Sequence, residues 1–501
     1  MKAVNAPVDR LDRLVGLGAA DSVALVDRQR QLSYAALEAE VSAVAAGLAA
    51  RISPGDRVAI WLPKSLEAVV AMLAVSRAGG VMVPINPVLR ARQVEHILAD
   101  SGARLLLTHL PRGATLEGAT VETHVIETDW GMLHGSGTAP DAVGGDALAA
   151  LLYTSGSTGA PKGVMVSHRN LLLGAAAVAD YLGTGADDRI LSVLPLGFDF
   201  GLSQLTTGLL CGARVVLLDY LAPRDLVQVV VREGITQLAA VPPLWMQLAA
   251  QDWPKEAATL TTLSNSGGRL PVPTVKRLLA LFPAARLHLM YGLTEAFRST
   301  TLPPELAADN PASIGRAIPN AEILVVRPDG TLADEGEPGE LVHMGPLVTA
   351  GYWRDAARTA ERFRPAPAAS ALGGMAVWSG DTVVRGADGL LSFVGRADET
   401  IKTMGMRVSP TEIEELAHGS GAVTEAMAFG LADETAGQVI RLLATPADGL
   451  TAAAAEVRLR DWLRREAAPF MHPASIVWLD TLDRTANGKI DRPALKARFG
   501  P

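Results

Sequence analysis

The stretch Tyr153-Thr154-Ser155-Gly156-Ser157-Thr158-Gly159-Ala160-Pro161-Lys162-Gly163 combines hydroxyl side chains with glycines and contains one lysine near its end. Such a loop can surround phosphate oxygens with backbone N–H groups and hydroxyls. It differs from a Walker A loop, because Pro161 precedes Lys162 and the apolar run Val164-Met165-Val166 follows. The alternative is a glycine- and serine-rich linker, which predicts neither the lysine nor the apolar flanks. The composition therefore favours phosphate binding.

Short apolar runs on both sides of this loop predict buried strands that alternate with helices. This pattern is typical of an α/β fold around a mostly parallel sheet. The run 57–62 follows a Pro-Gly turn, and apolar residues at helical spacing then extend from Leu66 to Leu73. Further strands are predicted at 81–85, 104–108, 164–166, 189–194, 214–218, 236–241 and 286–290.

The pattern changes twice in the second half of the chain. After about residue 320 the predicted strands are short and separated by turns, as at 322–326 and 340–343, which predicts a small β subdomain. A compact α+β pattern begins near residue 398, after a polar segment. We therefore expect a large N-terminal domain of layered α/β subdomains over residues 1–397 and a small α+β domain over residues 398–501.

The composition excludes several classes of protein. The 501 residues contain 45 Lys and Arg against 53 Asp and Glu, a net charge of −8, and no basic run dense enough to bind nucleic acid. The single cysteine, Cys211, cannot form an internal disulfide, which fits a reducing cytosol. Neither a signal peptide nor a charge-free stretch of roughly 20 residues for a membrane helix is recognisable. We expect a soluble, cytoplasmic protein.

The loop that starts at Tyr153 resembles the signature loop of the AMP-forming adenylating superfamily. That superfamily contains acyl- and aryl-CoA ligases, amino-acid adenylation domains and luciferase-like enzymes. Around residues 291–305 and 336–353, the chain is most similar to bacterial acyl-CoA ligases. Other stretches that resemble the superfamily, in its order and at its spacing, are 32–34, 55–60, 291–295, 378–381, 395–398, 401–408 and 485–492.

The resemblance implies a two-step reaction. A carboxylate is a poor electrophile because its leaving group would be oxide, so ATP first converts the acid to an acyl-adenylate and releases pyrophosphate. The thiol of CoA then displaces AMP. The implied cosubstrates and cofactor are ATP, CoA and Mg²⁺, and the implied C-terminal domain is a mobile lid. The expected setting is fatty acid or secondary metabolism.

Other functions stay open at this stage. The acceptor thiol can instead belong to the phosphopantetheine of a carrier protein that receives an acyl or amino acid. A homologue that binds nucleotide or acyl-adenylate without forming it belongs to a different class. A luciferase-like monooxygenase shares the adenylation step, but no feature of the sequence supports oxygen chemistry specifically.

The resemblance also assigns roles to individual residues. Thr294 is expected to contact the α-phosphate and Glu295 to hold Mg²⁺, a hard cation that prefers oxygen ligands. Lys489 is expected to bridge the substrate carboxylate and the α-phosphate, and the alternative is a mobile surface lysine. Tyr291 is expected to stack on adenine. The full set expected to bind ATP is Thr154, Ser155, Gly156, Ser157, Thr158, Gly159, Lys162, Ser266, Gly267, Gly268, Tyr291, Gly292, Asp381 and Arg396.

The acid pocket is predicted from four residues. Phe198 occupies a gating position, and Gly201 lies close to it in sequence. Asp199 has two interpretations: it binds the ammonium group of an amino acid, or it caps the helix after Phe198. For Arg298 we expect a surface position, and the alternative is a contact with a carboxylate or polar group of the substrate. In the lid, Asp398 is the expected hinge and Gly405 is expected to contact the pantetheine arm.

Near the C-terminus the chain departs from the superfamily at one position. Asp483 stands where proline is common, before the segment that contains Lys489. We expect this difference to alter the approach to the lysine loop without removing the lysine.

Overall fold

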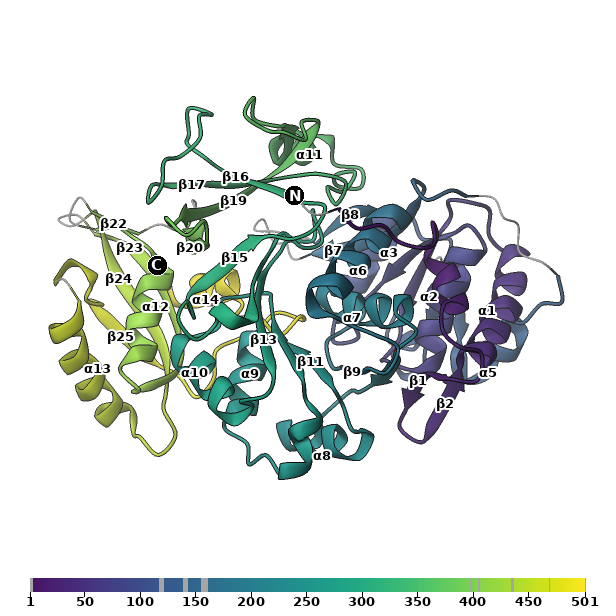
Figure 1. Cartoon of the computed structure of the whole chain (residues 1–501), viewed down its shortest axis with the longest axis horizontal. Helices are drawn as coiled ribbons and strands as arrows, with labels where there is room; N and C mark the ends of the chain where they lie inside the picture. The colour runs from purple at the N-terminus through teal and green to yellow at the C-terminus, as the bar shows by residue number, and fades with distance from the viewer. Residues whose placement is uncertain are drawn as a thin grey trace.

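Three β-sheets form the framework of the described part of the chain (Figure 1). The computed structural model describes residues 3–116, 121–137, 143–154, 161–396, 399, 401–403, 406–433, 437–467 and 469–500, with the backbone alone at 396, 402, 406, 407 and 437. The helices within these residues are α1 (Tyr34–Ala49), α2 (Leu66–Arg77), α3 (Ala91–Ser101), α4 (Leu110–Gly113), α5 (Ile126–Asp129), α6 (His168–Leu182), α7 (Asp199–Leu210), α8 (Pro223–Glu233), α9 (Pro242–Ala249), α10 (Val272–Leu281), α11 (Ala356–Arg362), α12 (Pro410–Gly419), α13 (Ala452–Glu466) and α14 (Arg492–Phe499).

The first sheet carries the hairpin that flanks the glycine-rich loop. Its strands run parallel except for the last pair, β7 and β8, which is antiparallel. In spatial order the strands are β6 (Glu122–Val125), β5 (Leu105–Thr108), β3 (Arg57–Trp61), β4 (Val81–Pro84), β7 (Leu148–Thr154) and β8 (Lys162–Ser167). The strands predicted at 57–62, 81–85, 104–108 and 164–166 are confirmed.

The second and largest sheet has a parallel centre and antiparallel extensions. Strands β10, β9, β11, β12 and β13 pair in parallel, and β14 and β15 continue the sheet antiparallel to β13. In spatial order the strands are β16 (Glu322–Val326), β17 (Pro338–Met344), β19 (Met375–Arg385), β20 (Leu391–Arg396), β15 (Ser313–Ala317), β14 (Thr300–Leu302), β13 (Arg286–Tyr291), β12 (Thr262–Asn265), β11 (Gln237–Ala240), β9 (Arg189–Ser192), β10 (Arg214–Leu217), β1 (Val23–Asp27) and β2 (Arg30–Ser33), with β18 (Phe363–Pro365) beside β19.

The β-rich segment predicted after residue 320 is therefore confirmed as a set of antiparallel strands, but it shares its hydrogen bonds with the large sheet. The link is the pairing of β15 with β20, in which Ser313 lies opposite Ser392. Sequence periodicity could predict the strands and not this pairing, because partners in a sheet are set by contacts between distant residues.

The third sheet belongs to the C-terminal part of the chain. It consists of β22 (Met406–Val408), β21 (Ile401–Thr403), β24 (Gly437–Pro446), β23 (Val423–Asp433) and β25 (Ser475–Trp478). Two clusters of buried hydrophobic residues on its faces are drawn only from residues 401–499. The predicted α+β pattern is confirmed there. The predicted boundary between residues 397 and 398 lies outside the described residues and stays a prediction.

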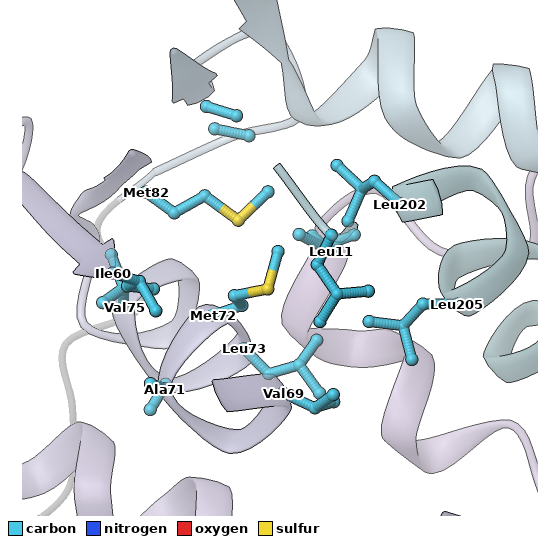
Figure 2. Packing of buried hydrophobic residues seen from close by; sticks show 14 of the residues in the cluster. Leu11, Ile60, Val69, Ala71, Met72, Leu73, Val75, Met82, Leu202 and Leu205 are labelled. Carbon is cyan, nitrogen blue, oxygen red and sulfur yellow. The ribbon is translucent and has the colours of Figure 1, made fainter. Parts of the chain in front are cut away.

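A hydrophobic cluster shared by α2, α7 and the short helix Leu11–Gly16 connects the first two sheets. Ser65 caps α2 by accepting a hydrogen bond from the amide of Ala68 (3.2 Å). Figure 2 shows Met72 and Leu73 of α2 in one buried cluster with Leu202 and Leu205 of α7. Burial of each such side chain stabilises the fold by about 1.5–3 kcal/mol relative to its exposure. This cluster fixes one side of α7 and leaves the other side for the site described below.

Within the part of the chain that the structure describes, no helix combines the length and apolar character needed to cross a membrane.

Candidate active site

The site lies at the carboxyl ends of the parallel strands β12 and β13. Ser266, Gly267 and Gly268 directly follow β12, and 292–295 directly follow β13. Because parallel strands end at the same edge of a sheet, these two loops lie next to one another, which is where ligands bind in open α/β sheets. The candidate residues around Ser266 and Glu295 are thus brought together by topology.

A close approach requires glycine at position 267. Its φ is 79°, a conformation that other residues rarely adopt. A Cβ atom at Gly267 would lie 3.0 Å from Cε of Lys489 and 3.3 Å from Cγ1 of Val241. The following loop is held by Asn265, whose side-chain amide donates to the carbonyl of Gly268 (3.0 Å). The backbone at Gly267 therefore forms one wall against Lys489.

Glu295 forms a three-residue cluster with Lys162 and Tyr352. Lys162 Nζ lies 3.4 Å from Glu295 Oε1 and donates to the Tyr352 hydroxyl (2.7 Å), which in turn donates to the same carboxylate oxygen (2.6 Å). The Glu295 side chain is only 12% exposed. Burial raises the pKa of Glu295, but Lys162 and the Tyr352 hydroxyl outweigh it and hold that pKa below its usual range. Glu295 is therefore an ionised, buried carboxylate, and not a solvated loop residue.

The sequence analysis did not include Tyr352 among the candidates. It lies 57 residues after Glu295, beyond the range of any local motif. Its ring also packs on the Lys162 ammonium, 4.0 Å from the ring centre. In the sequence, Tyr352 lies in the segment 336–353, which resembles bacterial acyl-CoA ligases. That resemblance assigned no function to Tyr352.

The glycine-rich loop is described only at its two ends. Thr154 is paired with Lys162 across β7 and β8, and the Thr154 hydroxyl is buried with no partner among the described residues. Ser155, Gly156, Ser157, Thr158 and Gly159 lie outside the described residues, so their predicted contacts remain predictions. Burial lowers the pKa of Lys162, and Glu295 only partly offsets this.

Tyr291 at the end of β13 and Asp381 of β19 are joined by a side-chain hydrogen bond. The Tyr291 hydroxyl donates to Asp381 Oδ2 (2.6 Å), and the Asp381 amide donates to Ser379 Oγ (3.1 Å). Ser379 is fixed by its own hydrogen bond to the carbonyl of Leu341 (2.7 Å). The register of β19 and β20 places Asp381 opposite Arg396, whose side chain lies outside the description. The predicted nucleoside residues Tyr291 and Asp381 are thus neighbours.

Lys489 comes from the C-terminal part of the chain and lies in this site. A tight turn carries it: the amide of Thr485 donates to the Lys489 carbonyl (2.7 Å), and Gly488 has a φ of 80°. Its Nζ lies 5.2 Å from the centre of the Phe198 ring. Burial lowers the pKa of the Lys489 amine, and the attraction of Asp199 only partly offsets it. The alternative of a mobile surface lysine does not fit this placement.

A residue that sequence analysis did not predict ties this turn to the N-terminal part. Buried Asn86, just after β4, donates from Nδ2 to the carbonyl of Ala486 (2.7 Å) and to Oδ1 of Asn487 (2.9 Å). Asn86 precedes a proline, and an Asn-Pro pair is typical of turns. The sequence therefore indicated a turn at Asn86 and gave no indication of its contact with the lysine turn. Asp483, the departure noted above, points elsewhere and pairs with Arg498 (3.4 Å).

Asp199 and Arg298 form a buried ion pair. Arg298 Nη1 lies 3.1 Å from Asp199 Oδ2, and Arg298 and Asp199 are 1% and 5% exposed, respectively. The expected surface position of Arg298 is therefore wrong. The capping interpretation of Asp199 is also wrong, since Phe198 is the N-cap and Asp199 is the first residue of α7. The sequence around either residue could not predict this ion pair, because Asp199 and Arg298 are 99 residues apart.

A pocket opens beside this ion pair. It lies between α6, α7 and strands β9, β11, β12 and β13. The cavity has a volume of about 30 Å³ for water-sized atoms, and most of its surface is apolar. Gly201 does not face the pocket: a Cβ atom there would lie 2.1 Å from the Pro195 carbonyl oxygen, so this glycine serves backbone packing.

The comparisons with known proteins agree with this arrangement. Residues 16–353 match the family described as AMP-binding enzyme, and residues 412–489 match the AMP-binding enzyme C-terminal domain. The chain belongs to the AMP-binding enzyme family. Its fold is the mixed α/β fold of adenylate-forming enzymes: it is similar to Bacillus subtilis o-succinylbenzoate-CoA synthetase, solved with an acyl-adenylate (26% identity, TM-score 0.84, covering 98% of this chain and 99% of that one).

Two curated relatives of this AMP-binding enzyme differ in length. A feruloyl-CoA synthase from Amycolatopsis is 32% identical over 94% of this chain and 94% of its own length. A linear gramicidin synthase from Brevibacillus parabrevis is 33% identical over 95% of this chain, which spans only 9% of that synthase polypeptide.

Glu295 is the carboxylate at this site that is predicted to hold Mg²⁺. Among the described residues, no group of three or more His, Cys, Asp or Glu side chains is arranged to hold one. Glu295 is a single ionised carboxylate that already contacts Lys162. Mg²⁺ commonly uses one or two carboxylates together with substrate phosphates, so Glu295 fits Mg²⁺ that arrives with a nucleotide.

Proposed function

We propose that this AMP-binding enzyme is an acid–CoA ligase that forms an acyl-adenylate from a carboxylic acid and ATP and then transfers the acyl group to the thiol of CoA. The observation that carries the proposal is the position of Lys489, which lies against Gly267 in the loop after β12 and has its Nζ 5.2 Å from the centre of the Phe198 ring. Its pKa is influenced by Asp199, Arg298, Asp381 and Glu295, so it lies within electrostatic reach of all of them. A residue at this junction can contact an acid and a nucleotide together.

In the first step, Lys489 would hold the substrate carboxylate against the α-phosphate. Its lowered pKa rises again when anions bind beside it, since opposite charge favours the ammonium form. Preorganised cations of this kind stabilise the charge that develops on phosphorus and on departing pyrophosphate. Thr294, buried in the loop after β13, would donate to the α-phosphate.

The nucleotide would occupy the edge formed by the loops after β12 and β13. Ser266, Gly267, Gly268 and Gly292 would line adenine, Tyr291 would stack on it, and Asp381 and Arg396 would bind the ribose. Thr154, Lys162 and the loop 155–159 would bind the β- and γ-phosphates. Mg²⁺, when bound at Glu295, would neutralise phosphate charge. Because Tyr291 and Asp381 are now joined by a hydrogen bond, ribose binding would exchange that bond for one to a ribose hydroxyl.

For the second step the C-terminal part would act as a lid. We propose a boundary at residues 397 and 398, with Asp398 as the hinge and Gly405 against the pantetheine arm. Polar contacts between the two parts support such a motion, and they include Arg269 with Glu415 (2.5 Å) and Asn86 with the lysine turn. Contacts of this kind, unlike a large apolar interface, break and re-form readily.

CoA is preferred over a carrier protein as the acceptor. The feruloyl-CoA synthase and the o-succinylbenzoate-CoA synthetase to which the chain is similar both have names that specify a CoA thioester. Amino acids are also disfavoured as substrates, because the carboxylate of Asp199 is already paired with Arg298. Retention of Lys489 in the site argues against a homologue that only binds nucleotide.

The test is ATP–pyrophosphate exchange across a panel of fatty, aryl and amino acids, followed by thioester formation with CoA or a carrier protein. We expect exchange with at least one acid and turnover with CoA. Lys489→Ala should lower exchange about 10²–10³-fold, as loss of one transition-state donor does, and should spare thioester formation from supplied acyl-adenylate. The matched control is Lys276→Ala, which removes an exposed lysine of α10. Exchange with no acid would contradict the proposal.

A further inference from the structure

Arg362, the last residue of α11, is a half-buried cation beside β19. Its backbone is held where the helix passes into β18, since Phe363 begins β18 and pairs with Val377 of β19. Its Nη1 donates to the carbonyl of Trp378, the next residue of β19 (3.0 Å). Arg362 is thereby fixed against the strand that carries Asp381.

The guanidinium of Arg362 lies directly against Gly380. A Cβ atom at position 380 would be 2.3 Å from Nη1 of Arg362, so the absence of a side chain there leaves room for the guanidinium. Asp381, which follows Gly380, accepts the hydrogen bond from Tyr291 and is proposed to bind the ribose. The Arg362 guanidinium therefore lies near the ribose end of the proposed nucleotide site.

The Glu295 cluster is the other neighbour of Arg362. Tyr352 of that cluster packs on the segment that carries Arg362: its amide donates to Oγ1 of Thr359 (2.9 Å), and its ring meets the ring of Phe363 edge-on (5.6 Å between centres). Burial raises the pKa of Glu295, and Arg362 is among the groups that hold this pKa below its usual range. Arg362 therefore also lies within electrostatic reach of the residues proposed to bind the phosphates and Mg²⁺.

The charges at this place do not balance. Glu295 lies 3.4 Å from Lys162 and offsets the charge of that lysine. Arg362 has no carboxylate within ion-pair distance in the described part of the chain. Burial lowers the pKa of Lys162, and Arg362 lowers it further, because two neighbouring cations repel each other. Two cations that share one carboxylate favour the binding of an anion, which relieves this repulsion.

We propose that Arg362 binds the β- and γ-phosphates of ATP as a second cation beside Lys162. An arginine has more donors than the one that the Trp378 carbonyl uses, and its planar group can present two of them in parallel to phosphate oxygens. When the carboxylate oxygen of the acid attacks the α-phosphorus, the bond from that phosphorus to the β-phosphate oxygen breaks, and pyrophosphate leaves with the electron pair. Arg362 stabilises the charge that pyrophosphate gains. The inference rests on the proposed ligase function and adds a residue to its site.

The test compares the affinities of the full chain for ATP and for AMP, each with Mg²⁺, by titration calorimetry. We expect Arg362→Met to weaken ATP binding about tenfold or more, the size of effect that follows the loss of a hydrogen bond to a charged group. AMP lacks the β- and γ-phosphates, so its affinity should change by about twofold or less. In ATP–pyrophosphate exchange, the KM for pyrophosphate should rise in the same variant.

The matched control is Arg364→Met, which removes a cation from the same segment. Arg364 lies over the ring of Trp378 (3.8 Å from the ring centre) and 3.5 Å from Glu340, and its loss should leave the affinity for ATP unchanged. Arg362→Lys keeps the charge without the planar group, so its affinity for ATP should lie between those of the wild type and Arg362→Met. If Arg362→Met does not fold, the comparison of ATP with AMP is made on Arg362→Lys.

The outcomes separate this inference from the proposed function. An equal loss of affinity for ATP and AMP would show that Arg362 only supports the strand of Asp381, and would overturn the inference. Wild-type affinity for ATP in Arg362→Met, or an equal loss in Arg364→Met, would overturn it as well, and each of these results leaves the ligase function in place. A protein with the expected affinities that exchanges pyrophosphate with no acid would instead contradict the ligase function and keep the phosphate contact.

Discussion

The side-chain nitrogen of Asn86 lies 2.7 Å from the carbonyl oxygen of Ala486 and so connects the first sheet to the turn that carries Lys489. The same nitrogen donates to Asn487. These two bonds hold the lysine in the site in the conformation described above. Asn86 is thus a positioning residue in our proposal, because it acts on the chemistry only through Lys489.

Asn86→Ala is expected to slow adenylate formation selectively. Loss of hydrogen bonds worth about 1 kcal/mol each lowers a rate by roughly 5–30-fold. Thioester formation from supplied acyl-adenylate should be unchanged, because that step does not need Lys489 in place. Asn86→Asp should be slower than Asn86→Ala, since its carboxylate would face two acceptors. Equal slowing of both steps, measured as exchange and as thioester formation, would contradict this role.

Tyr352→Phe tests the cluster around Glu295. The variant removes one hydroxyl that contacts both Lys162 and Glu295 and leaves the ring in place. We expect kcat/KM for ATP to fall about 5–10-fold, mostly through KM, as for the loss of one or two hydrogen bonds. The control is Tyr34→Phe, which removes a hydroxyl that donates to the carbonyl of Ala213 (2.8 Å) and contacts none of these residues. An unchanged KM for ATP in Tyr352→Phe would show that the cluster does not bind the nucleotide.

Gly267→Ala tests the wall beside Lys489. The new Cβ would approach Cε of Lys489 to 3.0 Å in a backbone conformation that alanine rarely adopts. We expect exchange activity to fall by at least about tenfold, because small displacements of a catalytic group are costly. Gly330→Ala has a similar φ of 86° but open space around it, and should keep full activity. A fully active Gly267→Ala would contradict the close packing at this wall.

Lys489→Met is expected to stabilise the protein while it removes adenylation. Because burial lowers the pKa of Lys489 from its usual 10.5, the native state binds its proton less tightly than the unfolded state does. The unfolded state then binds more protons as pH approaches 10.5, so the stability of the wild type rises with pH through this window. At lower pH, where Lys489 is charged in both the folded and the unfolded state, the burial of its charge lowers the free energy of unfolding by a constant amount.

The measurement is urea unfolding of both proteins at a series of pH values from about pH 7 to pH 10, below the ordinary lysine pKa of about 10.4. The difference in unfolding free energy between Lys489→Met and the wild type should favour the variant at neutral pH and shrink toward the alkaline end. Other groups that titrate in this range contribute equally to both proteins, so their contributions cancel in this difference. A difference independent of pH would contradict the low pKa of Lys489.

The sequence predicted the parts of the fold that depend on local periodicity. Strands such as β3 and helices such as α2 follow directly from the spacing of apolar residues. The union of the β-rich segment with the large sheet was not predicted, because it depends on one pairing between distant strands. Motifs in the sequence also pointed to Gly267 and Lys489, but their close approach is visible only in the structure.

Contacts between residues far apart in the chain account for what the sequence did not show. Tyr352 and Asn86 carry no local signature of their function, and each is defined by its partner. Arg298 follows Glu295 by three positions and looked like an exposed charge, yet its partner Asp199 and the aromatic rings of Phe200 and Phe297 bury it (4.7 and 5.4 Å from the ring centres). A charge flanked by aromatic residues was the signal available.

The bond between Asn86 and Ala486 joins residues 400 positions apart. During synthesis the residues proposed to bind ATP and the acid are therefore made before Lys489 and its turn. On the proposed roles, a nascent chain can hold its substrates before it can react them. A chain that ends before residue 489 would therefore bind its substrates without consuming ATP, because the lysine that joins them would be missing.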